Sequence, residues 1–299
     1  MHSPVSNRPA RKGAPLISVG IGSWTDKECK NLLYPKGLPD NERLTTYATF
    51  FDHVEVNSSY HRVPPLAFVE NWVKQTPGDF VFDFKLPKEI SGNPEGAARG
   101  GVHVPQVLRA AQPLIASGKL GTFFLVLPPG FGPENHRLEE LEPLIEKLQP
   151  HLLAVELRHS DWVEGAQRER TLAFFRKHQL VWIAVDMPRI KGSTIMPPVD
   201  EVTNSKLAYL RLHGRRPDWL TLKDAEAKHS YEYPAGELEE IAGRVRALAK
   251  NADAVHVVAN NHAQDFAPKT ALALQRLLGI GKREPIANLD ELLPGFSEG

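Results

Sequence analysis

Eight short apolar runs are spread along almost the whole length of the 299-residue chain. The runs occupy residues 17–21, 54–56, 80–84, 123–127, 152–157, 181–185, 207–212 and 254–259. Between most successive runs lies a stretch whose apolar residues recur at helical spacing, so the pattern predicts strands and helices in alternation. Repeated strand–helix units imply a parallel sheet, and about 250 residues of them is the usual size of a closed (β/α)₈ TIM barrel. We therefore expect a single barrel of the α/β class.

The domain organisation follows from the extent of this pattern. We expect a flexible leader at residues 1–15, one barrel domain at 16–279 and a C-terminal tail at 280–299. Barrels of this class routinely reach this length as one domain. The connections 187–205 and 214–233 show little helical period, so we expect irregular loops after the sixth and seventh strands. Long loops of this kind often bind ligands.

Composition limits the partners of the chain. Lys and Arg together number 36, as do Asp and Glu, so no bulk basic field attracts nucleic acid and such a partner is not favoured. A nucleic acid would need a local basic groove, for which Arg215, Arg216 and Lys223 with Trp219 are the candidates. No apolar stretch approaches the ~18 residues of a membrane span, so no membrane partner is expected. The only cysteine, Cys29, fits the cytoplasm, where disulfides are rare.

Polar residues interrupt or close several runs on one face. Side chains two residues apart share a face of a strand. Glu55 and Asn57 alternate with Val54 and Val56, so they point into the barrel if the valines face the helices. The third run closes on Lys85, whose face is opposite to that of the run's phenylalanines. Because barrel active sites lie at the ends of the strands, these side chains are candidates for the site.

The fifth and seventh runs carry the strongest signals. Glu156 and Arg158 share a face in one, as Arg211 and His213 do in the other, and the sixth run closes on Asp186. A buried glutamate beside an arginine is also typical of a structural ion pair. The convergence of charged residues from at least five strands on one rim nevertheless favours a functional site.

Three further residues complete the candidate set. Asn260 closes the eighth run, and Tyr60 lies just beyond the second. Trp24 follows two glycines after the first run, where it could form an apolar wall of the site.

These residues lie within motifs that identify a family resemblance. The motifs occupy residues 20–24, 54–60, 82–87, 155–162, 209–215 and 260–262. The chain resembles the DUF72 family, the YecE-like proteins, over about residues 17–279. The resemblance implies an uncharacterised protein with a TIM-barrel fold, because the reaction of the family is not established. Family members often carry Thr-His after the lysine–proline segment, whereas Ser91-Gly92 follows Ile90 here, so a role for that histidine does not carry over.

The first functional hypothesis is an enzyme acting on a small anionic substrate that bears a phosphate or carboxylate. Arg158 and Arg211 would clamp the anion. Glu156 or Asp186 would move a proton, with His213 as a second acid/base. Glu55, Asn57, Tyr60, Trp24 and Asn260 would help to bind the substrate. The residues do not distinguish a hydrolase, a lyase or an isomerase.

Lys85 has two alternative catalytic roles in this hypothesis. Its ammonium could act as a point charge on the anion, or its amine could form a Schiff base with a carbonyl substrate. The first role requires fewer additional assumptions. No cofactor is required in either role.

Two alternatives remain open. In one, Glu156, Asp186 and His213 hold a divalent metal ion for phosphoester cleavage, as in an endonuclease, or for sugar isomerisation. The neighbouring arginines would repel such a cation, so we favour the metal-free hypothesis over this one. In the other, the barrel binds an anion or a protein partner without catalysis.

Overall fold

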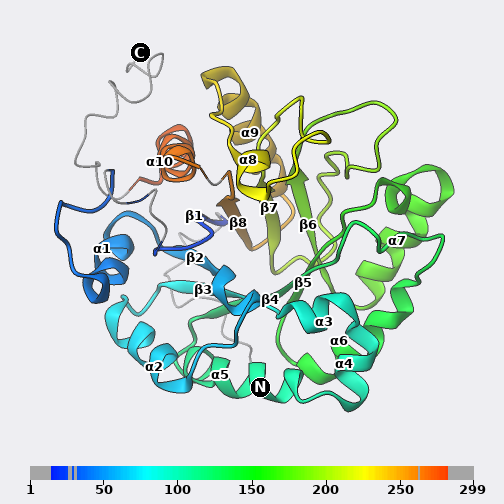
Figure 1. Ribbon diagram of the computed structural model, residues 1–299, viewed down its shortest axis with the longest axis horizontal. Helices are drawn as coiled ribbons and strands as arrows, with labels where there is room; N and C mark the ends of the chain where they lie inside the picture. The colour runs from blue at the N-terminus through cyan, green and yellow to red at the C-terminus, as the bar shows by residue number, and fades with distance from the viewer. Residues whose placement is uncertain (1–14, 26–28, 30–31, 262, 282–299) are drawn as a thin grey trace.

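The computed structural model describes residues 15–25, 29, 32–261 and 263–281. Within these residues, eight parallel strands form the inner wall of a barrel, with helices packed around it (Figure 1). This confirms the predicted (β/α)₈ fold. Most of the predicted leader and tail lies outside the described residues, so the domain boundaries stay predictions.

Each predicted apolar run forms a strand. The strands are β1 (Leu16–Ile21), β2 (His53–Val56), β3 (Val81–Lys85), β4 (Leu120–Val126), β5 (Leu153–Glu156), β6 (Val181–Asp186), β7 (Ala208–Leu212) and β8 (Ala254–Ala259). The longer helices are α1 (Arg43–Phe50), α2 (Leu66–Gln75), α5 (His103–Ala116), α7 (Gly165–Lys177), α9 (Ala235–Leu248) and α10 (Phe266–Leu278). Shorter ones are α3 (Lys88–Gly92), α4 (Pro94–Gly100), α6 (Glu142–Leu148) and α8 (Ala225–His229). The apolar stripes of these helices cover the outer face of the strands.

The sheet order is β1-β8-β7-β6-β5-β4-β3-β2, and each neighbouring pair in this order is parallel. Within the described residues no ladder joins β1 to β2, and Tyr47 of α1 bridges them instead. Its hydroxyl accepts from the Ile21 N–H at 3.1 Å and donates to the His53 carbonyl at 2.9 Å. A Cβ at Gly20 would lie 2.2 Å from that carbonyl oxygen, so only glycine allows this approach.

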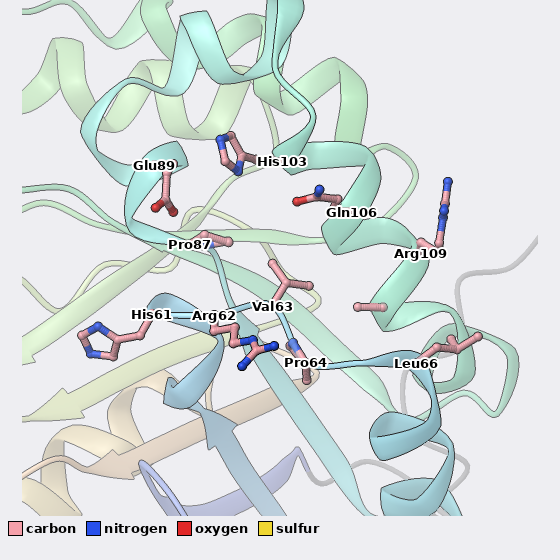
Figure 2. A pocket seen from close by; sticks show the side chains of 11 residues that line it. His61, Arg62, Val63, Pro64, Leu66, Pro87, Glu89, His103, Gln106 and Arg109 are labelled. Atoms are coloured by element: carbon pink, nitrogen blue, oxygen red, sulfur yellow. The ribbon is translucent and has the colours of Figure 1, made fainter.

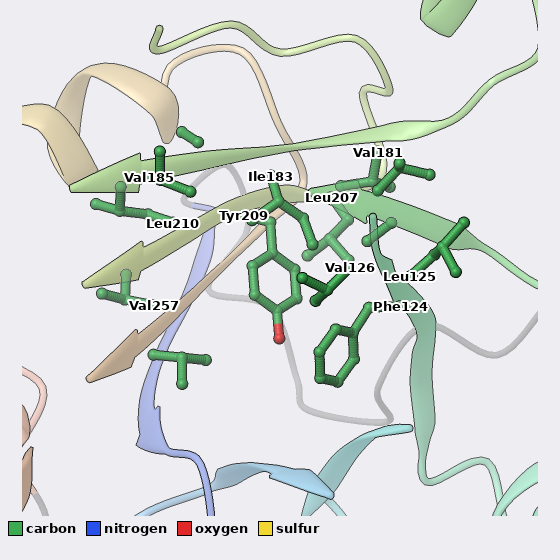
Figure 3. Close-up of a cluster of buried hydrophobic side chains, with 14 of the residues drawn as sticks. Phe124, Leu125, Val126, Val181, Ile183, Val185, Leu207, Tyr209, Leu210 and Val257 are labelled. Carbon is green, nitrogen blue, oxygen red and sulfur yellow. The ribbon is translucent and has the colours of Figure 1, made fainter. Parts of the chain in front are cut away.

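The barrel interior combines apolar and polar layers. Phe124 of β4 and Tyr209 of β7 face each other inside it, with ring centroids 6.3 Å apart (Figure 3). Ile183 and Val185 of β6 belong to the same buried cluster. The interior is therefore packed, and ligands must approach from its ends.

The irregular loops are present as expected. The described chain from Met187 to Leu207 contains no helix or strand, and the stretch after β7 contains only the short α8. Among the described helices, none is both long enough and apolar enough to span a membrane.

Candidate functional site

Arg211 of β7 lies at the centre of a buried polar cluster inside the barrel. Its Nε and Nη2 donate to the two carboxylate oxygens of Glu55 at 2.7 and 2.8 Å, and its Nη1 donates to Glu156 Oε2 at 2.5 Å. All three side chains are at most 1% exposed. Burial opposes the charge of Arg211, but the two carboxylates outweigh it and raise the pKa of the guanidinium. Arg211 is therefore committed to internal partners and does not face a ligand, contrary to its predicted role in an anion clamp.

Glu156 connects this buried pair to the mouth of the barrel. Its Oε1 accepts from Arg158 Nε at 2.7 Å, and its Oε2 lies 3.4 Å from His213 Nε2. Burial disfavours the ionised carboxylate, but Arg211, Arg158 and His213 outweigh burial and hold its pKa well below the usual range. Glu156 is therefore a permanent anion and a weak base.

His213 contacts the Glu156 carboxylate, and Asn260 connects His213 to Arg211. His213 is completely buried, and burial lowers its pKa, which favours the neutral imidazole. Its Nδ1 lies 3.0 Å from Asn260 Nδ2, while Asn260 Oδ1 accepts from Arg211 at 3.2 Å. Asn57 Nδ2 reaches Glu55 at 3.3 Å and Asn260 at 3.5 Å. These residues lie close together, in positions that orient Glu156 and Arg211.

Tyr209 is a member of this cluster that the sequence reasoning missed. Its hydroxyl donates to Glu55 Oε1 at 2.9 Å inside the barrel. Tyr209 lies two residues before Arg211 and so shares its face, which is the signal that could have identified it.

Lys85 differs from the other cations of the cluster. Its Nζ lies 4.6 Å from the centroid of the Tyr60 ring and 5.9 Å from that of Phe124. No carboxylate among the described residues forms an ion pair with it. Burial, with the charges of Arg211 and Arg158, lowers the pKa of Lys85 to about 7, despite the opposing effect of Glu55 and Glu156. The amine therefore changes protonation state near neutral pH.

The charges of the cluster leave a local cationic excess. Glu55 and Glu156 neutralise Arg211 and one further cation. Arg158 uses Nε for Glu156, and its two Nη groups have no hydrogen-bond partner within the described part of the chain, while its side chain is 25% exposed. Arg158 and Lys85 are therefore the groups that can meet an anion at this end of the barrel.

Asp186 does not join this cluster, which corrects its predicted role in proton transfer. It accepts two hydrogen bonds from Arg215 at 2.8 and 2.7 Å, one from Arg244 at 2.6 Å and one from the Tyr233 hydroxyl at 2.9 Å. Arg244 comes from α9 on the outside of the barrel. Trp182 shares the face of Asp186 on β6 and packs on Phe175 of α7 at 5.1 Å, so this face points to the helices.

The predicted metal ligands Glu156, Asp186 and His213 are accordingly not assembled. Among the described residues, the only group of three or more His, Cys, Asp or Glu with ligand atoms within 4.8 Å of one another is a different one. The structure therefore does not support a divalent-metal site formed by these three residues.

Trp24 also lies elsewhere than expected. It is 8% exposed and packs edge-to-face on Trp72 of α2 at 5.0 Å and on Phe82 at 6.3 Å. The phenylalanines of β3 face the helices, so Trp24 belongs to the outer core and forms no wall of the site.

The basic residues after β7 are paired with acids. Arg215 binds Asp186 and Glu240, and Arg216 forms two hydrogen bonds to Asp218 at 2.8 and 2.6 Å. Trp219 is buried, at 7% exposure. These contacts remove most of the basic groove that a nucleic acid would have required.

A surface groove begins next to Tyr60 and Lys85 along the chain. It has a volume of about 410 Å³ and is lined by His61, Arg62, Val63, Pro64, Leu66, Pro87, Glu89, His103, Gln106, Arg109 and Ala110. Figure 2 shows the segment after Tyr60 on one side and α5 on the other. Arg62 and Arg109 give the groove two cationic side chains that form no ion pair with described residues. No pattern in the sequence indicates this groove, because its walls come from segments that are separate in the chain, around residues 61–66 and in α5.

Comparison with known proteins identifies the relatives of this barrel. The family model described as "Protein of unknown function DUF72" matches residues 18–293. The chain belongs to the DUF72 family. It is similar to the UPF0759 protein YunF of Bacillus subtilis, at 25% identity over 279 residues, which cover 89% of this chain and 95% of YunF. It is also similar to the UPF0759 protein YecE of Escherichia coli K12, at 30% identity over 162 residues, which cover 52% of this chain and 54% of YecE.

Two solved DUF72 structures share the fold. A DUF72 protein of Enterococcus faecalis V583 superposes with a TM-score of 0.79 at 25% identity, covering 91% of this chain and 98% of that one. A DUF72 protein of Thermotoga maritima MSB8 gives a TM-score of 0.78 at 26% identity, covering 88% and 99%. These relatives confirm the predicted family and barrel, and their descriptions name no substrate or reaction.

Proposed function

We propose that this DUF72 protein is an enzyme that binds a small phosphate- or carboxylate-bearing substrate at the carboxyl ends of its strands and catalyses proton transfer. Arg158 binds the anion with its free Nη groups, and Lys85 is the general acid/base. Glu55, Glu156 and Arg211 form a buried frame that orients Arg158 through Glu156 and sets the charge around Lys85. We also propose a cytoplasmic location, in keeping with the single cysteine.

The environment of Lys85 carries the proposal. A group whose pKa is near the working pH is the most effective proton carrier, because both of its protonation states are populated. Lys85 meets this condition with a pKa of about 7. The pKa of Glu156 is far too low for the same task, and His213 is sealed from solvent.

Arg158 supplies the complementary binding function. Its bond to Glu156 fixes the guanidinium plane, which reduces the entropy lost when an anion binds. A planar guanidinium with two free nitrogens suits the paired oxygens of phosphate or carboxylate.

The groove beside Tyr60 extends the surface that a substrate can use. Arg62 and Arg109 line it, and Pro87 and Glu89 follow Lys85 within four residues. A second anionic or polar end of the substrate would lie against these side chains.

The test is a screen of sugar phosphates, phosphorylated alcohols and hydroxycarboxylates with the purified protein, followed by NMR. Turnover of one compound is expected, with a loss of at least ~10²-fold in Lys85→Met and in Arg158→Met. The matched control is Lys74→Met, because Lys74 is an exposed lysine of α2. Lys85→Arg should shift the pH–rate profile to higher pH.

Two results contradict the proposal. Turnover in Lys85→Met at the wild-type rate removes the lysine from the chemistry. An anion that binds through Arg158 but is never converted identifies a binding protein instead of an enzyme. Borohydride trapping with a carbonyl substrate separates proton transfer by Lys85 from Schiff-base formation, because only a Schiff base leaves a mass adduct on it.

A further inference from the structure

A second buried polar cluster lies deeper in the barrel, towards the amino ends of the strands. His53 is the first residue of β2, Asp83 is in the middle of β3 and His256 is in the first half of β8. His53 Nε2 lies 2.6 Å and His256 Nδ1 lies 2.8 Å from the same oxygen, Asp83 Oδ2. Neither histidine contacts Lys85 or Arg158, so the cluster is separate from the proposed anion site.

The charge of Asp83 lacks an ordinary partner. Asp83 is completely buried, and within the described residues no lysine or arginine forms an ion pair with it. Its two partners are histidines, which carry a positive charge only when protonated, so a bound cation would stabilise this buried carboxylate.

We propose that His53, Asp83 and His256 bind a divalent transition-metal ion, with Zn²⁺ the best match. Their ligand atoms, His53 Nε2, Asp83 Oδ2 and His256 Nδ1, all lie within 4.8 Å of one another. Two imidazole nitrogens and one carboxylate oxygen are a donor set that Zn²⁺ prefers.

The geometry needs only a small adjustment. Tetrahedral Zn²⁺ with bonds of about 2.0–2.1 Å holds its ligand atoms about 3.3 Å apart. The contacts of His53 and His256 to Asp83 would therefore widen by about 0.7 and 0.5 Å as the ion replaces the hydrogen bonds. Each imidazole then carries its proton on the other nitrogen, and His53 Nδ1 has no hydrogen-bond partner that this change would disturb.

The surroundings of the cluster fit an ion. The Thr122 N–H donates to the second oxygen of Asp83 at 3.1 Å, which fixes the carboxylate, as outer hydrogen bonds do in metal sites. A Cβ on Gly121 would lie 2.4 Å from that oxygen and 3.0 Å from His256 Cε1. Only glycine at this position leaves room for the carboxylate and the imidazole.

An opening beside His256 supplies access and a fourth ligand. A cavity of about 30 Å³ is lined by His256, Gly121 and residues at the starts of the strands, including Leu16, Val81 and Ala254. This volume holds one water molecule, which could complete a tetrahedron with the three side chains.

The ion would stabilise the barrel at its weakest seam. It would connect β2 and β3 to β8, whereas among the described residues β1 and β2 share no ladder. A metal ion that binds only the folded chain contributes its binding free energy to stability.

The test uses the full-length protein purified without chelators and without a histidine tag. Elemental analysis is expected to find about one equivalent of metal. After removal of metal with a chelator, Zn²⁺ should raise Tm by several degrees. Co²⁺ should give the intense visible absorption of a tetrahedral site.

Variants locate the ion. His256→Gln should weaken Zn²⁺ binding by at least ~100-fold, whereas His103→Gln, a histidine of α5 outside the cluster, should leave it unchanged. Because His53 and Asp83 variants could fail to fold, the wild-type Co²⁺ spectrum and its displacement by Zn²⁺ serve as an independent measurement. The proposal is overturned if Zn²⁺ does not change the Tm of the metal-depleted protein and Co²⁺ gives no visible absorption. The three side chains would then be held together by hydrogen bonds alone. Retention of full affinity in His256→Gln overturns it as well.

Discussion

Glu156 and Asp186 both close a strand, both are buried and both accept hydrogen bonds from arginines, yet they lie on opposite sides of the barrel wall. Glu156 pairs with Arg211 inside the barrel, and the Arg211 side chain is only 1% exposed. The partners of Asp186, Arg215 and Arg244, are 15% and 10% exposed and also bind surface acids. The first network leads to the mouth of the barrel, and the second attaches α9 to the outer wall.

The contrast shows that a polar residue at a strand end is not by itself a site residue. The face of the strand decides, and the face alternates with each residue. Glu156 shares its face with Arg158, whereas Asp186 shares its face with the packed side chain of Trp182. A candidate in a barrel therefore needs its inward or outward direction established before it is given a role.

Removal of Arg211, the central arginine of the network around Glu156 inside the barrel (the inner network), should have the largest effect on stability. Arg211→Met leaves the buried Glu55 without a cation and Glu156 with Arg158 alone, so the free energy of unfolding should fall by about 3–5 kcal/mol. Arg215→Met should cost only about 1 kcal/mol, because Asp186 keeps Arg244 and Tyr233. Urea unfolding of both variants measures the difference. Equal losses of unfolding free energy in the two variants would mean that both networks contribute equally to stability, which would contradict this prediction.

Neutralising each carboxylate should separate function from stability. Once a substrate is known, Glu156→Gln should lower turnover by about 10²-fold, because Arg158 loses the charge that orients it. Asp186→Asn should keep turnover within about 3-fold, because this carboxylate faces the helices. Steady-state kinetics on folded variants gives the answer, and a large loss in Asp186→Asn would return this residue to the site.

Acid should weaken the inner network. The folded-state pKa of Glu156 lies well below its ordinary value of 4.5, so its contribution is fully present above pH 4.5 and is lost as the pH falls below it. Urea unfolding at pH 6 and pH 3.5 should show a drop that is about 1 kcal/mol smaller in Glu156→Gln than in the wild type. An identical drop in both proteins would show that the carboxylate is not preferentially ionised in the folded state.

Replacement of Lys85 should have the smallest effect on stability, and this effect should appear at neutral to alkaline pH and not in acid. Because its folded-state pKa is lowered from 10.5 to about 7, the unfolded chain binds more protons between these values, and stability rises with pH across them. Lys85→Met should therefore be more stable than the wild type at pH 7, by about 1 kcal/mol given the partial exposure of Lys85. The difference should shrink towards pH 10. A variant without this trend would indicate an ordinary solvated ammonium.

The sequence predicted the fold almost completely, because the fold follows from patterns within short segments of the chain. Apolar runs of strand length alternate with helical stripes, and only a few architectures bury that pattern. Alternation also identified Glu55, Glu156 and Arg211 as inward-facing, and these residues do meet. It failed for Asp186 because the run before it is apolar on both faces, which hides the direction of its last residue.

The sequence by itself determined the barrel, the family and the set of charged residues that close its strands. Only the tertiary structure decided which of these charges neutralise one another, because that depends on contacts between strands far apart in the chain. Arg211 meets Glu55 across 156 positions. The same contacts leave Lys85 without an acidic partner and place His53 beside Asp83 and His256. Pairing in a buried interior is set by the distances between atoms and by the cost of an unpaired charge, and neither is written in the order of residues along the chain.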